Sequence, residues 1–140
     1  MNYPGDLFSD VELLKSLADL SDEISFDRFH AQDLQVETKP DATPVTDADR
    51  AVEKKIREHL LKERPLDKII GEEFGNPDEI TSGERYWVID PIDGTKNFLR
   101  GVPIWATLIG LVHRDENGKD QVIAGMVSSP ALFRRWYAAQ

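Results

Sequence analysis

Apolar side chains recur at three- and four-residue intervals through the first 30 positions of the chain. From about Asp6 to His30 this spacing predicts one long amphipathic helix, and Ser21 and Ser25 are the places where it could break. The apolar positions that define its buried face are Leu7, Val11, Leu14, Leu17 and Ala18, with Leu20, Ile24, Phe26 and Phe29 continuing the pattern.

A polar stretch with two prolines separates this helix from a second one. Asp33 to Pro44 is expected to be a loop or an extended edge segment, because each proline favours extended backbone at the residue before it. The second helix opens at Thr46, with Asp49 three positions on as in a capping box. Its apolar positions are Ala48, Val52, Ile56 and Leu60, and it should end before Pro65.

The rest of the chain is typical of short strands separated by turn-forming residues. A short helical turn from Thr95 to Arg100 would have Thr95 as its N-cap and Gly101 as its C′ residue. Asn117-Gly118 is a strong hairpin signal. Strands are predicted at 68–71, 86–89 (stopping at Asp90-Pro91), 105–113, 121–128 and 132–138, with a surface loop at 76–83. The order predicts an α+β fold, in which two N-terminal helices pack on a largely antiparallel sheet.

Composition and net charge limit the kinds of molecule that the chain is expected to bind. The 140 residues are 40% hydrophobic, enough for one modest core and a single domain, and the formal net charge is −9. Nucleic acid and anionic membrane surfaces would be repelled at long range, so neither is an expected partner. No apolar run is long enough to span a membrane and no secretory signal precedes Leu7, so a cytoplasmic location is expected. With no cysteine, a metal would be held by oxygen or imidazole.

The carboxylates that follow two of the strands are the candidate chemistry. Asp90 ends a hydrophobic strand and Asp93 lies three residues later, so both can converge at the strand end, as Mg²⁺ requires of its oxygen ligands. Gly94 and Thr95 then begin a helix whose first N–H groups favour an anion. Glu72-Glu73 would complete the site if its strand is a neighbour.

Each piece alone also has a plain structural explanation. Asp90-Pro91 and Asp93-Gly94 are common in turns, Glu72-Glu73 could be a solvated pair, and Thr46 with Asp49 could be only a capping box. Trp105 is more readily explained as a core aromatic. Lys96 and Arg100 fit a solvated face, the helix 95–100 could be a connector, and His30, His59 and His113 have no ligand-like spacing.

The full string Trp87-Val88-Ile89-Asp90-Pro91-Ile92-Asp93-Gly94-Thr95-Lys96-Asn97-Phe98, with Gly71-Glu72-Glu73 and Val45-Thr46-Asp47-Ala48-Asp49, resembles the inositol monophosphatase family. The resemblance implies the N-terminal half of a layered αβαβα fold, shared with fructose bisphosphatases, and a site for two or three Mg²⁺ ions. Glu72, Asp90 and the Ile92 carbonyl would ligate metal, and Asp93 would serve a second ion bridged by Asp90.

The same resemblance implies roles for the remaining site residues. Asp49 and Thr95 would orient the attacking water, and Glu73 would be a supporting acid. The backbone of Gly94 and Thr95 would hold the phosphate, next to Asp93. Lys39 falls near the family's mobile-loop lysine.

Within the family, the run from Thr95 to Ile109 and the tail from Ser129 to Trp136 resemble the histidinol-phosphate phosphatases. The implied function is Mg²⁺-dependent hydrolysis of a small phosphorylated metabolite, L-histidinol phosphate, to L-histidinol and phosphate in histidine biosynthesis. An inositol-1-monophosphatase or another small phosphomonoesterase of the family is the alternative. A non-catalytic half-domain that binds metal or phosphate is the alternative of another class.

Family chains are about twice as long, and their second half supplies another aspartate ligand in a W-D-x-A-A motif, which this sequence lacks. Residues 1–140 are therefore expected to form the N-terminal metal- and phosphate-binding half, weakly active alone. A homodimer is expected of the full-length form.

Overall fold

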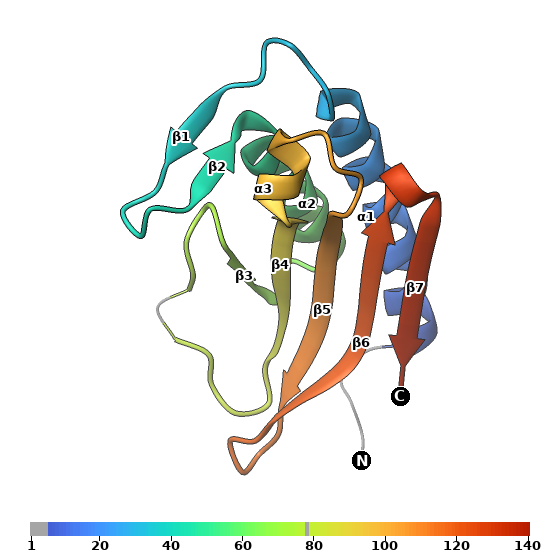
Figure 1. Ribbon diagram of the computed structural model, residues 1–140. Helices are drawn as coiled ribbons and strands as arrows, with labels where there is room; N and C mark the ends of the chain where they lie inside the picture. The colour runs from blue at the N-terminus through green and yellow to red at the C-terminus, as the bar shows by residue number, and fades with distance from the viewer. Residues whose placement is uncertain (1–5, 78) are drawn as a thin grey trace.

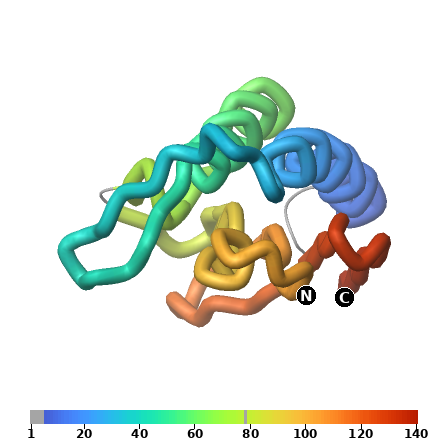
Figure 2. The backbone as a smooth tube through the Cα atoms, turned by 45° about the horizontal axis from the view of Figure 1, so that its top comes forward, coloured from blue at the N-terminus to red at the C-terminus, as the bar shows by residue number. Residues whose placement is uncertain are grey.

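The computed structural model describes residues 6–77 and 79–140, and its secondary structure is α+β as predicted. Two long helices lie side by side and cover one face of a five-stranded sheet (Figures 1 and 2). None of the helices in this described part is long and apolar enough to span a membrane.

Helix α1 (Leu7–Arg28) is continuous, so the possible break at Ser21 or Ser25 does not occur. Asp6 caps its first turn by accepting a hydrogen bond from the Phe8 N–H at 3.1 Å. Ser21 and Ser25 are buried on the face that packs against the sheet, and the Ser21 hydroxyl donates to the Leu17 carbonyl. The hydroxyl of Ser21 is thus satisfied within the helix, which continues through both serines.

The polar stretch after α1, expected to be a loop or an extended edge segment, contains a small hairpin of two extended strands. Strands β1 (Val36–Thr38) and β2 (Pro44–Thr46) pair antiparallel and stand beside the sheet (Figure 1). Helix α2 (Asp47–Glu63) follows directly, and Thr46 and Asp49 form the predicted capping box. Helix α2 ends before Pro65 as expected.

The main sheet has the order β3-β4-β5-β6-β7, in which only β3 and β4 run parallel. Its inner face meets α1 and α2 through a core centred on Leu14, Leu17, Trp87 and Leu111. The strands are β3 (Lys68–Gly71), β4 (Arg85–Asp93), β5 (Ala106–Arg114), β6 (Asp120–Ser129) and β7 (Arg134–Ala139). Residue 78, within the predicted loop 76–83, lies outside the described residues.

Strand β4 does not stop at Asp90-Pro91 as predicted but continues to Asp93. The pairing with β5 shifts register between Asp90 and Asp93, and Pro91 sits in this irregular segment, where its missing N–H is tolerated. The Thr107 hydroxyl donates to the Pro91 carbonyl at 2.8 Å and fixes the irregular segment to the neighbouring strand.

Helix α3 (Thr95–Leu99) starts one residue earlier than the sequence indicated, because its N-cap is Gly94 and not Thr95. Gly94 has a left-handed φ of 88°, which glycine adopts without strain. Gly101 follows the helix with φ 73°, as predicted for a C′ residue. Thr95 is therefore the first helical residue, and its side chain is directed to other partners.

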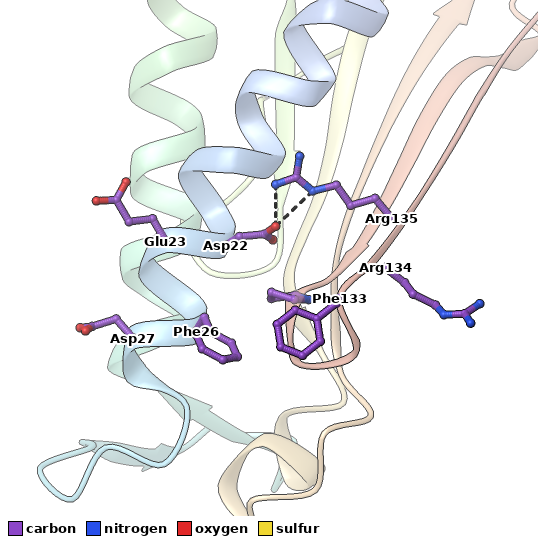
Figure 3. A pocket seen from close by; sticks show the side chains of 8 residues that line it. Asp22, Glu23, Phe26, Asp27, Phe133, Arg134 and Arg135 are labelled. Carbon is purple, nitrogen blue, oxygen red and sulfur yellow. Dashed lines mark hydrogen bonds and ion pairs between the residues drawn. The ribbon is translucent and has the colours of Figure 1, made fainter.

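Strand β7 begins later than predicted, after a short 3-10 turn at Pro130–Leu132 and a left-handed Phe133. Arg135 of β7 forms an ion pair with Asp22 of α1 at 2.7 Å, which ties the edge strand to the helix layer (Figure 3). Phe26 and Phe133 lie beside this pair and line a surface hollow.

Candidate functional site

A cleft of about 650 Å³ opens where the β1–β2 hairpin, the ends of β3 and β4, and the start of α3 come together. The walls carry carboxylates on one side and the start of a helix on the other. The lining residues are Lys39, Asp41, Thr43, Pro44, Glu72, Glu73, Asp90, Ile92, Asp93, Gly94, Thr95, Lys96 and Asn97.

The parallel pairing of β3 and β4 brings two of the predicted carboxylates together. Gly71 is opposite Ile89, so Glu72, which directly follows β3, lies beside Asp90 of β4. The adjacency on which the sequence argument depended is thus present in the fold.

Asp90 lies in a strongly acidic environment. Burial, and then the charges of Glu72, Asp93, Asp49 and Glu73, raise the pKa of its carboxyl to about 7. Each of these four groups repels a negative charge on Asp90. The cleft therefore has an excess of negative charge that a cation would neutralise.

Asp49, in the first turn of α2, is buried and does not itself line the cleft, but it contacts Thr95, which does. Its two carboxylate oxygens have different partners. Oδ2 accepts hydrogen bonds from the Thr46 N–H at 2.8 Å and the Thr46 hydroxyl at 2.6 Å. Oδ1 accepts from the Thr95 hydroxyl at 3.1 Å. Burial raises the pKa of Asp49, although these hydrogen bonds oppose the shift. The capping role and the contact with α3 are therefore both present in one side chain.

Thr95 also lies within hydrogen-bond distance of the Ile92 carbonyl, 3.1 Å from its hydroxyl. The Ile92 side chain is buried in a small core with Ala48, Phe98 and Trp105, which fixes the backbone of this segment. Trp105 is thus a core aromatic, as predicted from the sequence. Asp93, one residue beyond Ile92, is exposed at the cleft.

Gly94 begins α3 in a place where a side chain would not fit easily. A Cβ there would approach the Ile104 carbonyl oxygen to 3.1 Å, and φ 88° disfavours other residues. The first N–H groups of α3 have no acceptor within the helix and lie next to the cleft, which is where an anion would be stabilised.

Glu73 is held by the cation of Lys39, which comes from the loop between β1 and β2. The two side chains form an ion pair at 2.8 Å, and that of Glu73 is only 5% exposed. Burial lowers the pKa of Lys39, but the hydrogen bond and the charge of Glu73 outweigh it and the net pKa is raised. Burial raises the pKa of Glu73 despite Lys39. The sequence placed Lys39 near the site but gave no partner for it.

The sequence did not single out Glu53, although it is fully buried behind the cleft and bonds to the backbone of Glu73 and Phe74. Its only sequence signal is its place one turn after Asp49 on the same face of α2.

The oxygen donors suit a hard divalent cation by their chemistry. Carboxylates and one backbone carbonyl are the ligands that Mg²⁺ prefers, and the raised pKa of Asp90 reports the uncompensated charge between them. Among residues 6–77 and 79–140, however, no three His, Asp or Glu side chains already converge closely enough to hold an ion. Glu73 is engaged by Lys39, and Asp49 by Thr46 and Thr95.

The hollow beside Phe26 and Phe133 is chemically different. Its acidic groups come from α1 and one of them, Asp22, is already paired with Arg135 (Figure 3). It contains none of the carboxylates that the sequence pointed to, and we assign it no role in the site.

The fold and the cleft together define a class, an α+β protein whose sheet edge presents clustered carboxylates beside a glycine-started helix. A comparison with known families matches residues 9–140 to the inositol monophosphatase family, and the chain belongs to that family.

Its curated relatives include histidinol-phosphatases from Streptomyces coelicolor and Mycobacterium tuberculosis. Each is 55% identical, over 96% and 94% of this chain and over 49% and 48% of the relative, respectively. The structure of an inositol monophosphatase from Zymomonas mobilis superposes with a TM-score of 0.73 at 36% identity, covering 96% of this chain and 49% of that one. The chain therefore spans about half the length of the relatives it matches.

Proposed function

We propose that residues 1–140 form the N-terminal, metal- and phosphate-binding half of a Mg²⁺-dependent phosphomonoester phosphatase. The observation that carries the proposal is the hydrogen bond from Thr95 to Asp49 at the wall of a cleft crowded with carboxylates around Asp90. The Thr95 hydroxyl, hydrogen-bonded to the Asp49 carboxylate beside an acidic pocket, suits hydrolysis better than simple binding of an anion.

Glu72, Asp90 and the Ile92 carbonyl would hold one divalent ion, and Asp93 would serve a second one together with Asp90. Two or three ions would be bound per complete site. Bound Mg²⁺ supplies a more acidic water and neutralises phosphoryl oxygens. Such ions explain how a chain with a net charge of −9 accepts a phosphate ester.

Asp49 and Thr95 would orient the attacking water. Oδ2 of Asp49 is already occupied by Thr46, so Oδ1 is the oxygen that accepts the Thr95 proton. The Thr95 oxygen then has a lone pair directed away from Asp49, which can accept a proton from water. Glu73, held by Lys39, would support this exchange as an additional acid.

The phosphate would lie against the backbone of Gly94 and Thr95, beside Asp93. Gly94 lets the start of α3 pack against Ile104 and Trp105, where a Cβ would be 3.1 Å from the Ile104 carbonyl oxygen, and the first turn of α3 offers N–H donors. No positive side chain is required at this point if cations already bridge the carboxylates and the phosphate.

L-histidinol phosphate is the proposed substrate. The support comes from the histidinol-phosphatases of Streptomyces and Mycobacterium at 55% identity over nearly the whole chain. An inositol-1-phosphate or a related small phosphomonoester is the second candidate within the family, supported by the similarity to the Zymomonas inositol monophosphatase.

A non-catalytic half-domain is the candidate from another class. It is favoured by the apolar surface on the sheet face away from the helices, where Val88 and Val122 are 39% and 58% exposed. Such a module would use Glu72, Asp90 and Asp93 but would have no need for the Asp49–Thr95 pair.

Phosphate release decides between these candidates. The chain would be assayed alone and fused to the second half of the Streptomyces histidinol-phosphatase, with and without Mg²⁺, on L-histidinol phosphate, inositol 1-phosphate and fructose 1,6-bisphosphate. We expect Mg²⁺-dependent release from L-histidinol phosphate by the fusion and little release by the chain alone. Preference of the fusion for inositol 1-phosphate would refute the substrate, and a folded fusion inactive on all three esters would favour the half-domain.

A further inference from the structure

Three polar residues stand in one row on α2. Asp49, Glu53 and Arg57 are spaced four apart, so they share the helix face that looks toward the cleft and the segment after β3. Asp49 contacts Thr95, as described above. The other two residues contact the segment that carries Glu72 and Glu73.

Glu53 is fully buried, and both of its carboxylate oxygens are used. Oε1 accepts the Glu73 N–H at 2.9 Å, and Oε2 accepts the Phe74 N–H at 2.8 Å. Oε2 also accepts from Nε of Arg57 at 3.0 Å, while another nitrogen of Arg57 donates to the Gly75 carbonyl at 2.6 Å. In the segment after β3, Glu53 therefore accepts hydrogen bonds from backbone N–H groups, and Arg57 donates a hydrogen bond to a backbone carbonyl.

A buried carboxylate is costly unless charged and hydrogen-bonded partners compensate it. Here the chain also provides the space for it, because a Cβ on Gly71 would lie 2.5 Å from the Glu53 carboxyl group. Glu53 and Arg57 thus bind the backbone of residues 73–75, and the absence of a side chain at Gly71 leaves the space that Glu53 occupies. A simple core contact would need none of these three residue types.

The segment after β3 carries two of the acidic side chains that line the cleft. Glu72, Glu73 and Asp90 all line it, and the pairing of Gly71 with Ile89 places Glu72 beside Asp90, so their negative charges repel one another. Backbone hydrogen bonds to Glu53 oppose the displacement that this repulsion favours without placing another side chain in the cleft. Because the same helix holds Thr95 through Asp49, α2 sets the spacing between both walls of the site.

We propose that Glu53 and Arg57 are positioning residues that hold the backbone of Glu72 and Glu73 in place for cation binding beside Asp90. The inference rests on the proposed function of the cleft. Glu53 and Arg57 would touch neither metal nor substrate and would act only through the backbone segment to which they are hydrogen-bonded.

The test compares Glu53→Gln with Glu58→Gln, a matched control on the exposed side of the same helix. Glutamine keeps the size of Glu53 but turns one acceptor into a donor facing an N–H group. Two measurements on the chain are needed: amide hydrogen exchange of Glu73 and Phe74 by NMR, and Mg²⁺ affinity by calorimetry.

In Glu53→Gln we expect exchange at Glu73 and Phe74 to accelerate about tenfold or more and Mg²⁺ affinity to fall by roughly 10- to 100-fold, as for other groups that orient metal ligands. Glu58→Gln should change neither. A folded Glu53→Gln protein with unchanged Mg²⁺ affinity would overturn the proposal while leaving the proposed function intact. If the unmodified chain takes up no Mg²⁺, the proposed function fails and the positioning role fails with it.

Four further variants, two at glycines and two at Arg57, keep the test decisive if Glu53→Gln does not fold. Gly71→Ala retains every charge but forces the Glu53 carboxylate aside, whereas Gly110→Ala, with no atom within 4 Å of the added Cβ, is its control. Gly71→Ala should weaken Mg²⁺ binding and Gly110→Ala should not. Arg57→Lys can keep only one of the two arginine contacts, so its Mg²⁺ affinity should lie between those of the unmodified chain and of Arg57→Met. Equal Mg²⁺ affinity in all three proteins would count against the role of Arg57.

Discussion

Replacing Asp90 with asparagine is expected to stabilise the metal-free chain at pH 8, the opposite of what loss of a partly buried polar group usually does. The pKa of Asp90 is raised from 3.8 to about 7, because burial and four neighbouring carboxylates disfavour its charged form. The folded chain therefore binds a proton more tightly than the unfolded chain. Asparagine removes the charge and with it the repulsion.

The pH window follows from the direction of this shift. Below about pH 3.8 Asp90 is protonated in both states and contributes no difference. Between 3.8 and about 7 the unfolded chain ionises first, so stability falls as the pH rises, and above about 7 the full penalty is present. Other titrating groups cancel when the unmodified chain and Asp90→Asn are compared at the same pH.

The size of the effect can be bounded. A shift from 3.8 to about 7 is about 3 units, which at about 1.4 kcal/mol per unit gives a ceiling of about 4 kcal/mol. Asp90 is partly solvent-accessible, so screening reduces this to about 1–2 kcal/mol. At pH 5 only a fraction of the penalty has developed, and the stabilisation should be smaller there.

Urea denaturation in the presence of EDTA, at pH 5 and pH 8, measures the effect. Asp27→Asn is the control, because Asp27 is exposed on α1 and is not among the residues that line the cleft. We expect Asp90→Asn to raise the free energy of unfolding more at pH 8 than at pH 5. Equal destabilisation at both pH values would refute the electrostatic reasoning.

Three further changes test other parts of the account. Asp49→Asn in the fusion should lower phosphate release by roughly 10²- to 10⁴-fold, as for loss of a positioned base, with Mg²⁺ binding retained; unchanged turnover would exclude Asp49 from the reaction. Gly94→Ala should cost about 1–2 kcal/mol in a urea titration, because a non-glycine residue is strained at φ 88°; no change would mean that the start of α3 adapts. Asp10→Asn should cost about 2–3 kcal/mol, because the buried guanidinium of Arg85, which lies 2.9 Å from each Asp10 oxygen, would lose one charged partner while keeping Asp67 at 3.0 Å; a loss below about 1 kcal/mol would mean that the pair behaves as an exposed one.

The sequence predicted the long elements well because their signals are local. The four-residue repeat of Ala48, Val52, Ile56 and Leu60 is the buried face of α2, and the Thr46–Asp49 capping box lies within one helical turn. The Asn117-Gly118 turn likewise joins β5 and β6, with Gly118 in the left-handed region that such turns require.

The errors arose where a distant residue decides the local structure. Strand β4 continues past Pro91 because Thr107, sixteen residues away, holds the Pro91 carbonyl. Thr95 is not the N-cap of α3 because Gly94 takes that place, and its hydroxyl lies within reach of Asp49, 46 positions earlier.

The candidate site shows the same division. The position of Glu72 directly after β3 could be predicted from the pattern, whereas Asp90 lies within β4, which continues to Asp93. The adjacency of Glu72 and Asp90 required the parallel pairing of β3 and β4. The Lys39–Glu73 pair spans 34 residues and the Glu53 contacts span 20 and 21. No local signal reports such contacts. The roles of these residues in catalysis remain predictions for experiment.

Calorimetric titration of Mg²⁺ into the metal-free chain at pH 8 tests the central claim most directly, because it requires only residues 1–140. We predict saturable binding that is lost in Asp90→Asn and retained in Asp27→Asn. Absence of saturable binding by the unmodified chain, or equal binding by Asp90→Asn, would contradict the assignment of the cleft as a cation-holding half-site.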